Sequence, residues 1–401
     1  MSFVKAAFAK LAQVLRASRP SPMVRALLAV GLLWLCFVHI LPSLSSGHLI
    51  GKNAIAYGWT PQMAAEQTPL TRWDARWYHA IASNGYYTAG PDKEGSVRFY
   101  PLFPILMAGA KWLTGIQLFW AGTIVSALAL LGSLALLAKR AREENNEETG
   151  MATAEALLFF PSAFILASAY SESVTLFATV LAVVLARRGQ WLWAGVAGAA
   201  AALGRVNGVL VVLPILVLAV SAWRADRRWK PAVAVAIASL GAAAYPAYLW
   251  WKFGDPLLYF HTRPPWWAQH PRFFVLFLWD IAKAALAMIS TGTVPKTVQT
   301  MTAKMFPFHL AVLALMSWAL VASVRKRKWD DAAFMAGACL FATSVGSLDS
   351  LARHSLIYYP MYLRLGETAA AHRTFRLGLT LVCLSTQAVL LTMFVRWVFV
   401  L

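Results

Sequence analysis

Apolar runs recur along almost the whole chain, and most of them are about 15–22 residues long, close to the roughly 20 that a helix needs to cross a bilayer. Of the 401 residues, 59% are hydrophobic and only 13% are charged. A soluble domain of this length would need more polar surface. No long Ser/Gly linker divides the chain. The pattern predicts an all-α polytopic integral membrane protein with one domain, residues 1–401.

Basic residues in the connections set the expected orientation, because Lys and Arg favour the cytoplasmic side. With every basic cluster placed inside, we expect about eleven membrane spans. We predict them at residues 24–41, 118–138, 153–169, 174–187, 190–204, 208–222, 231–251, 306–324, 332–347, 355–369 and 377–398. This topology requires residues 99–115 and 273–290 to be re-entrant or interfacial. Residues 3–15 are predicted to form an amphipathic helix on the cytoplasmic surface.

The net charge of +19 has a simple origin in this topology, because the basic residues sit in short cytoplasmic connections. They set the topology and contact anionic lipid, so we expect membrane lipids and no nucleic acid as partners. The three cysteines fall in apolar runs without metal-ligand spacing. No cofactor is assigned, and a divalent metal remains open without support from a ligand cluster.

Five polar segments should converge on the outer side of the membrane. Two of them are long, a first outer loop at residues 43–98 and a second region at 252–305. The other three are corners at 170–173, 204–208 and 348–355. A simple pore needs no such collection of loops, whereas an enzyme acting on a lipid-borne substrate does. We expect interfacial helices in these loops.

Asp74 stands in the first outer loop among aromatic and basic residues. Residues 72–84 predict a short amphipathic helix, with Trp73, Trp77 and Ile81 on one face at headgroup level. Asn84 followed by glycine is a suitable helix stop. A carboxylate in this setting is a candidate site residue. The alternative is an interfacial anchor whose Asp74 only caps the helix or pairs with Arg76.

Other outer corners carry one acid and two fixed cations. Glu172 lies between two apolar runs, where an unpaired carboxylate is costly and needs a partner or a water-filled cavity. Arg205 stands between two glycines that allow close backbone approach, and Arg353 precedes His354. Arginine suits phosphate oxygens. The alternatives are a solvated corner acid and arginines that snorkel from helix ends.

The ordered set of motifs over about residues 70–365 resembles the PIG-V-like mannosyltransferases, the family of the second mannosyltransferase of glycosylphosphatidylinositol assembly. The departure at Thr88, where the family often carries an acid, favours a bacterial relative with another acceptor. The matching segments are Trp73-Asp74, Ile81-Ala82, Gly85-Tyr86, Phe99-Tyr100-Pro101-Leu102-Phe103-Pro104, Pro161-Ser162-Ala163-Phe164, Tyr170-Ser171-Glu172-Ser173, Arg205-Val206-Asn207-Gly208 and, more loosely, Arg353 ahead of Tyr359-Pro360.

This resemblance implies a GT-C glycosyltransferase, which takes a sugar, here most simply mannose, from a polyprenyl-phosphate donor on the non-cytoplasmic face. The acceptor would be a lipid, glycan or protein. The family places its Trp-Asp pair in the active site, and Glu172 matches the acid of its second outer loop. A bacterial relative would lie in the inner (plasma) membrane with its site facing the periplasm or exterior.

The chemistry needs a base for the acceptor hydroxyl and cations for the leaving phosphate. We therefore expect Asp74 to act as base and the reaction to invert the anomeric centre, while Glu172 orients the acceptor or a basic partner. The donor phosphate is assigned to Arg205, Arg353 and His354. Substrate binding is assigned to Trp73, Tyr78, Tyr100, Tyr170 and Asn207.

A transporter or flippase for a lipid-linked saccharide is the alternative from a different class, because charged residues in membrane segments also mark transport paths. The sequence shows no inverted repeat of broken helices, which many transporters carry. The large outer loops favour the enzyme.

Overall fold

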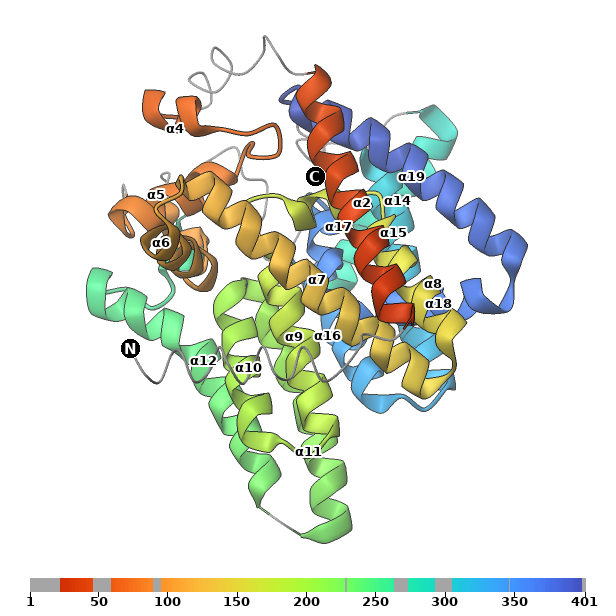
Figure 1. Cartoon of the computed structure of the whole chain (residues 1–401). Coiled ribbons are helices and arrows are strands. Elements are labelled where there is room, and N and C mark those ends of the chain that lie inside the picture. The colour runs from red at the N-terminus through yellow and green to blue at the C-terminus, as the bar shows by residue number, and fades with distance from the viewer. Residues whose placement is uncertain are drawn as a thin grey trace.

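The computed structural model describes residues 22–45, 59–88, 95–227, 229–262, 273–292, 305–345 and 347–398. Helices make up most of these ranges (Figure 1). Extended pairing among them is limited to the isolated bridge between Thr88 and Gly95. The all-α prediction is confirmed. The expected cytoplasmic helix at residues 3–15 lies outside the described residues.

Within the described ranges, six helical segments are long and apolar enough to cross a membrane, judged by length and composition. They are α7 (Leu118–Glu144), the segment Val206–Asp226 formed by η3 and α11, α12 (Lys230–Phe253), α14 (Phe274–Thr291), α15 (Phe306–Arg325) and α19 (Arg373–Val395). Other helices pack among them: α2 (Pro22–Ser45, apolar over Ala29–Ile40), α8 (Glu147–Leu158), α9 (Glu172–Arg187), α10 (Trp191–Gly204), α16 (Trp329–Ser344) and α18 (Tyr359–Ala371).

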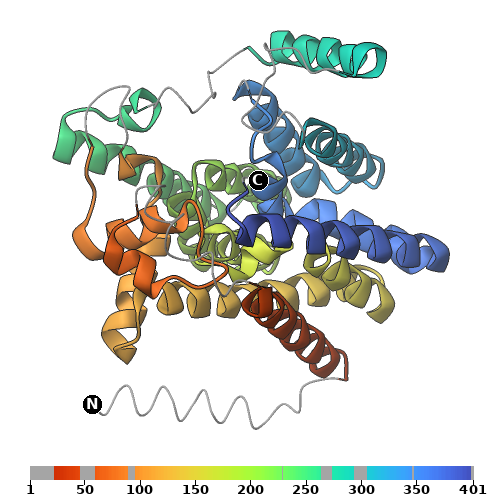
Figure 2. The ribbon, with the colours of Figure 1, turned by 90° about the horizontal axis from the view of Figure 1, so that it is seen from above.

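Helix α9 is the most enclosed of these elements. It packs against α7, α10 and α11, and its segment lies near the middle of the molecule seen from above (Figure 2). Twelve of its sixteen residues are buried. Glycines allow close packing between its neighbour α10 and α12. A Cβ added at Gly241 would lie only 2.4 Å from the Cα of Ala199. The first residue of α9, Glu172, is therefore held in a rigid setting.

The predicted span at residues 153–169 is wrong. Helix α8 ends at Leu158, and a separate 3-10 turn, η2, runs from Ala163 to Ala167. Pro161 explains the break, because proline lacks the N–H of a helical ladder and pushes the preceding residue out of the α region. The chain here is buried by protein, with Leu157 and Phe164 fully enclosed.

The two segments expected to be re-entrant or interfacial take different forms. Residues 273–290 are not re-entrant, because α14 is one continuous helix that packs against α16. Its Asp280 is buried and does not interrupt the helix. Within residues 99–115 the chain forms one helix, α6 (Leu102–Thr114). A helix rises roughly 1.5 Å per residue, so α6 is too short to span a bilayer. That this segment is re-entrant or interfacial stays a prediction.

One end of the bundle is closed by buried ion pairs. A nitrogen of Arg140 near the end of α7 lies 2.6 Å from the carboxylate of Asp331, and one of Arg187 at the end of α9 lies 2.7 Å from that of Asp330. Both acids belong to the first turn of α16. These helices therefore share one charged end, which holds several of the predicted cytoplasmic connections. Glu172, at the opposite end of α9, marks the other face.

The orientation is testable with single cysteines in a variant whose three native cysteines are replaced. We expect Asn84→Cys, exposed at the end of α5 (Ala75–Asn84), to react with a membrane-impermeant maleimide added outside cells. Glu147→Cys, exposed at the opposite end, should react only after the membrane is opened. The reverse pattern would invert the topology.

Candidate active site

A buried arginine fixes the loop that leads into the site. The guanidinium of Arg72 is fully enclosed and donates to the carbonyl of Thr68 at 2.6 Å and to the side chain of Gln67 at 2.9 Å. It also reaches the carbonyl of Val395 at the end of α19, 3.3 Å away. Burial lowers its pKa to about 10. Arg72 thereby fastens this loop to α19.

Asp74 immediately precedes α5, with Trp73 before it in a left-handed conformation (φ 50°). Its carboxylate caps no backbone N–H in the described chain and pairs with Arg353, whose Nη1 is 2.6 Å from Asp74 Oδ2. The expected helix stop is confirmed, since α5 ends at Asn84 and Gly85 has φ 77°. The suggested partner, Arg76, instead lies over the ring of the neighbouring tryptophan. Asp74 is thus paired with Arg353 and does not cap the helix, and its role in the site stays a prediction.

The prediction that Trp73, Trp77 and Ile81 form an apolar stripe at headgroup level is wrong. Trp77 and Ile81 are buried, and Trp77 stacks on Phe99 with ring centroids 5.5 Å apart. Trp73 is partly buried against Trp397. These side chains face protein because α6 and the loop before it cover α5. The stripe therefore anchors α5 to the protein and so fixes the position of Asp74.

Glu172 opens α9 with no exposed surface. Its Oε1 lies 2.5 Å from Nη1 of Arg205 and 3.4 Å from Nε of Arg353. The expectation that this acid has a partner is therefore met, and it has two. The four charged residues form a chain, Asp74–Arg353–Glu172–Arg205, in which acids and bases alternate and formal charge cancels.

Arg205 reaches Glu172 because the backbone around it is tightly packed. It follows α10 in an extended conformation, and a Cβ at Gly204 would lie 2.3 Å from the hydroxyl of Thr175. A Cβ at Gly208 would lie 2.0 Å from the carbonyl of Ala201. The predicted close approach at both glycines is thus observed. Larger residues there would push the Arg205 corner away from α9.

Arg353 lies on the short helix α17 (Leu351–His354), which is held in place by a hydrogen bond from the hydroxyl of Ser162 to the carbonyl of Ala352. Burial lowers the pKa of Arg353, but the carboxylates of Asp74 and Glu172 raise it more, and the net pKa is above its ordinary value. This guanidinium is permanently charged. Its side chain keeps 12% exposure, beside 23% for that of Asp74.

His354 follows Arg353 in the same helix, and its pKa is shifted in the opposite direction. Burial and the positive charges of Arg205 and Arg353 hold its pKa well below the ordinary value. It is therefore neutral at pH 7. The predicted phosphate role is limited to an N–H hydrogen bond, since His354 carries no charge to contribute.

The predicted substrate-binding residues divide into two groups. Trp73, Tyr78, Tyr170 and Asn207 belong to the segments that carry the charge chain. The Tyr78 hydroxyl lies 2.8 Å from that of Ser171, which in turn accepts a hydrogen bond from Arg205 at 3.2 Å. Burial raises the pKa of Tyr78 to about 12, so its hydroxyl stays protonated.

Three predicted substrate-binding residues remain to be placed: Tyr170, Asn207 and Tyr100. The Tyr170 hydroxyl donates to the carbonyl of Arg72 at 2.8 Å and accepts from the backbone N–H of Asp74 at 3.2 Å. Asn207 donates to the hydroxyl of Tyr358 at 3.0 Å. Tyr100 packs in a separate aromatic group, 4.7 Å from the ring of Tyr245. The rings it packs against, those of Tyr245 and Tyr259, do not belong to the charge chain.

Sequence reasoning missed Ser171 and His309. Ser171 joins Tyr78 to Arg205, and its place beside Glu172 was the available signal. His309 of α15 is fully buried, and neither ring nitrogen has a hydrogen-bond partner in the described structure. Its charge, if present, would act on His354. A polar residue inside an otherwise apolar run could have flagged it.

Among the described residues, no group of three or more His, Cys, Asp or Glu side chains is arranged to hold a metal ion. The charge chain supplies two acids only, and each is occupied by an arginine. In this arrangement positive charge at the site comes from arginine side chains.

Comparison with known proteins gives fold-level likeness only. No protein-family model matches the chain, and no curated protein matches it. Among solved structures, ArnT from Cupriavidus metallidurans bound to undecaprenyl phosphate is similar over 92% of this chain, with 16% identity and a TM-score of 0.49. The oligosaccharyltransferase AglB from Archaeoglobus fulgidus, in complex with an inhibitory peptide and a dolichol-phosphate, aligns over 93% with 12% identity and a TM-score of 0.44.

The chain spans 64% of the ArnT chain and 55% of the AglB chain. Neither likeness assigns a substrate to this chain. The resemblance to PIG-V-like mannosyltransferases is not confirmed by these comparisons and stays a prediction.

The central acid should dominate the stability of this region. We expect Glu172→Ala to lower the free energy of unfolding by about 3–5 kcal/mol, because two largely buried arginines lose a shared partner. Glu143→Ala, at a half-exposed carboxylate on the opposite end, should change it by less than about 1 kcal/mol. Thermal unfolding in detergent measures both. Equal effects would show that the Glu172 pairs contribute little.

Proposed function

We propose that this protein is an inverting GT-C glycosyltransferase that moves a sugar from a polyprenyl-phosphate donor to an acceptor hydroxyl. One observation carries the proposal: four outer segments bring Asp74, Arg353, Glu172 and Arg205 into one chain of ion pairs at the end of the helices. An assembly of this kind offers an acid for proton removal next to cations for a phosphate.

The arginines are the proposed holders of the donor phosphate. Arg353 and Arg205 carry fixed charges, and a guanidinium has five N–H donors, so each has donors beyond those used by the carboxylates. A phosphate entering here competes with Asp74 for Arg353. Glu172 has no exposed surface and two arginine partners, which supports a role in orienting these cations over direct contact with the acceptor.

Asp74 is the proposed base because it is the more exposed of the two acids. A carboxylate paired with an arginine is a weak base. When the donor phosphate draws Arg353 away, Asp74 becomes free to accept the proton. The acceptor oxygen then forms its bond to the anomeric carbon while the bond from that carbon to the phosphate oxygen breaks. The phosphate leaves with the bonding electrons, and direct displacement inverts the centre.

The finer features of the proposal come from the motif resemblance and the basic connections. They favour mannose as the sugar, a bacterial inner membrane as the location and a site that faces the periplasm or exterior. The acceptor class, a lipid, glycan or protein, is left open. Membrane lipids surround the chain.

Purified protein given radiolabelled polyprenyl-phosphate mannose and a membrane extract should form a labelled product. We expect Asp74→Asn to reduce turnover by at least a thousandfold while donor binding is kept or strengthened, because Arg353 loses its competing carboxylate. Asp226→Asn, at an exposed acid on the far end of α11, is the matched control. Near-normal turnover in Asp74→Asn would remove Asp74 as the base. No transfer by folded parent protein from any polyprenyl-phosphate sugar would refute the proposed function.

Donor affinity tests the arginines separately. Charge-assisted hydrogen bonds are worth about 1.5–3 kcal/mol each, so Arg353→Ala should weaken donor binding roughly ten- to hundredfold. Arg353→Lys should recover only part of this, because a point charge cannot fork across two oxygens. Arg205→Ala follows the same logic, with the half-exposed Arg188→Ala as control. Unchanged affinity in both alanine variants, with folding verified, would place the phosphate elsewhere.

A further inference from the structure

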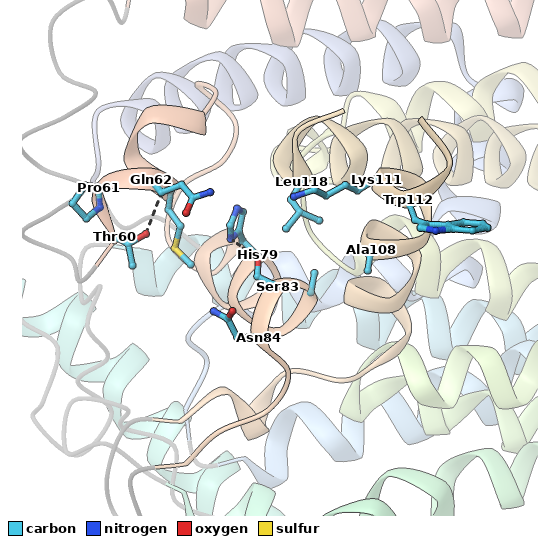
Figure 3. A pocket seen from close by; sticks show the side chains of 12 residues that line it. Thr60, Pro61, Gln62, His79, Ser83, Asn84, Ala108, Lys111, Trp112 and Leu118 are labelled. Atoms are coloured by element: carbon cyan, nitrogen blue, oxygen red, sulfur yellow. Dashed lines mark hydrogen bonds between the residues drawn. The ribbon is translucent and has the colours of Figure 1, made fainter. Parts of the chain in front are cut away.

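A cavity lies on the face of α5 that turns away from the charge chain (Figure 3). It has a volume of about 630 Å³. Its floor is α5, and its walls are α4 (Pro61–Glu66) with the preceding Thr60 on one side and α6 with Leu118 of α7 on the other. The polar side chains that line it include Gln62, His79, Ser83, Asn84 and Lys111.

This cavity is separate from the charge chain although both use α5. Consecutive residues of a helix point about 100° apart, and Tyr78 turns to Ser171 while His79 turns to the cavity. The two ring nitrogens of His79 lie 3.3 Å from Glu66 and 3.4 Å from Ser83. Glu66 supports the histidine without lining the cavity.

Lys111 supplies the positive charge. Its side chain extends from α6 toward the space above His79 (Figure 3), and no ion pair is found for it among the described residues. The neutral groups of Gln62, Ser83 and Asn84 offer hydrogen bonds around it. An ammonium group with neutral donors beside it suits an anionic oxygen.

The outer surface of α6 is apolar beside this cation. Trp112 is 84% exposed, and Leu113 and Ile105 are also strongly exposed. Exposed apolar surface of this size is typical of contact with lipid or a partner, and the tryptophan and lysine side by side are typical of a membrane interface. Acyl chains along α6 would place a lipid head group at Lys111.

We propose that this cavity binds the phosphate-bearing head group of a membrane lipid, with Lys111 contacting the phosphate. The site does not depend on the proposed transfer reaction, since its residues lie outside the charge chain. Two sources share this chemistry: a bilayer phospholipid and a polyprenyl phosphate.

Native mass spectrometry of the full chain in detergent tests the proposal, with phosphatidylglycerol as the probe and diacylglycerol as the probe without phosphate. We expect the parent to bind phosphatidylglycerol about tenfold more tightly than Lys111→Gln does, and diacylglycerol to show no such difference. Lys283→Gln, at an exposed lysine of α14, should match the parent. Ser83→Trp keeps Lys111 but fills the cavity, and it should lose binding as well.

Loss in both Lys111→Gln and Ser83→Trp, with unfolding temperatures near that of the parent, supports the site. Binding retained in either variant overturns it: in Lys111→Gln the cation is not the contact, and in Ser83→Trp the lipid binds outside the cavity. Displacement of phosphatidylglycerol by polyprenyl phosphate identifies a carrier lipid as the source, and no displacement identifies a phospholipid. Asp74→Asn should bind like the parent, so failure of the transfer proposal leaves this result unaffected.

Discussion

A carboxylate with no exposed surface at the start of an apolar helix is costly unless cations and hydrogen bonds compensate for its lost water. Glu172 is in this position, and Arg205 and Arg353 provide the compensation. The requirement ties together three corners that are far apart in sequence. Through Arg353 it extends to Asp74 and the first outer loop. The arrangement of the segments at this end of the bundle depends on this shared acid.

The same chain of pairs links binding to reactivity. Arg353 stands between the two acids, so any anion that attracts it alters the environment of both. A base that is neutralised by its own arginine until a phosphate arrives would be inactive without donor. This coupling requires that the four charged side chains keep fixed positions. The hydrogen bonds of buried Arg72, the tightly packed glycines beside Arg205 and the enclosed helix α9 hold them in place.

Much of the helical architecture follows from the sequence, because apolar length is a strong signal. The break at Pro161 was misjudged because composition outweighed a single proline in the interpretation of residues 153–169. The side chains of Trp77 and Ile81 were assigned to lipid because spacing defines a face without saying what covers it. Phe99 and α6 cover it here.

The four charged residues were each proposed from the sequence, but their pairing was not predictable. Asp74 and Arg353 are 279 positions apart, and spacing rules reach only one or two helical turns. A local partner, Arg76, was the alternative open to sequence reasoning. Glu172 pairs with both Arg205 and Arg353, and only the positions of α9, α10 and α17 reveal this. His309 shows the same limit, since a single histidine in an apolar run carries no information about its neighbours.

The most direct test of this account is an experimental structure of the chain with a polyprenyl phosphate bound. The account predicts phosphate oxygens within hydrogen-bond distance of Arg353, Arg205 or both, with the Asp74–Arg353 pair opened and Glu172 still paired. A phosphate bound away from both arginines, with the four-residue chain unchanged, would contradict it.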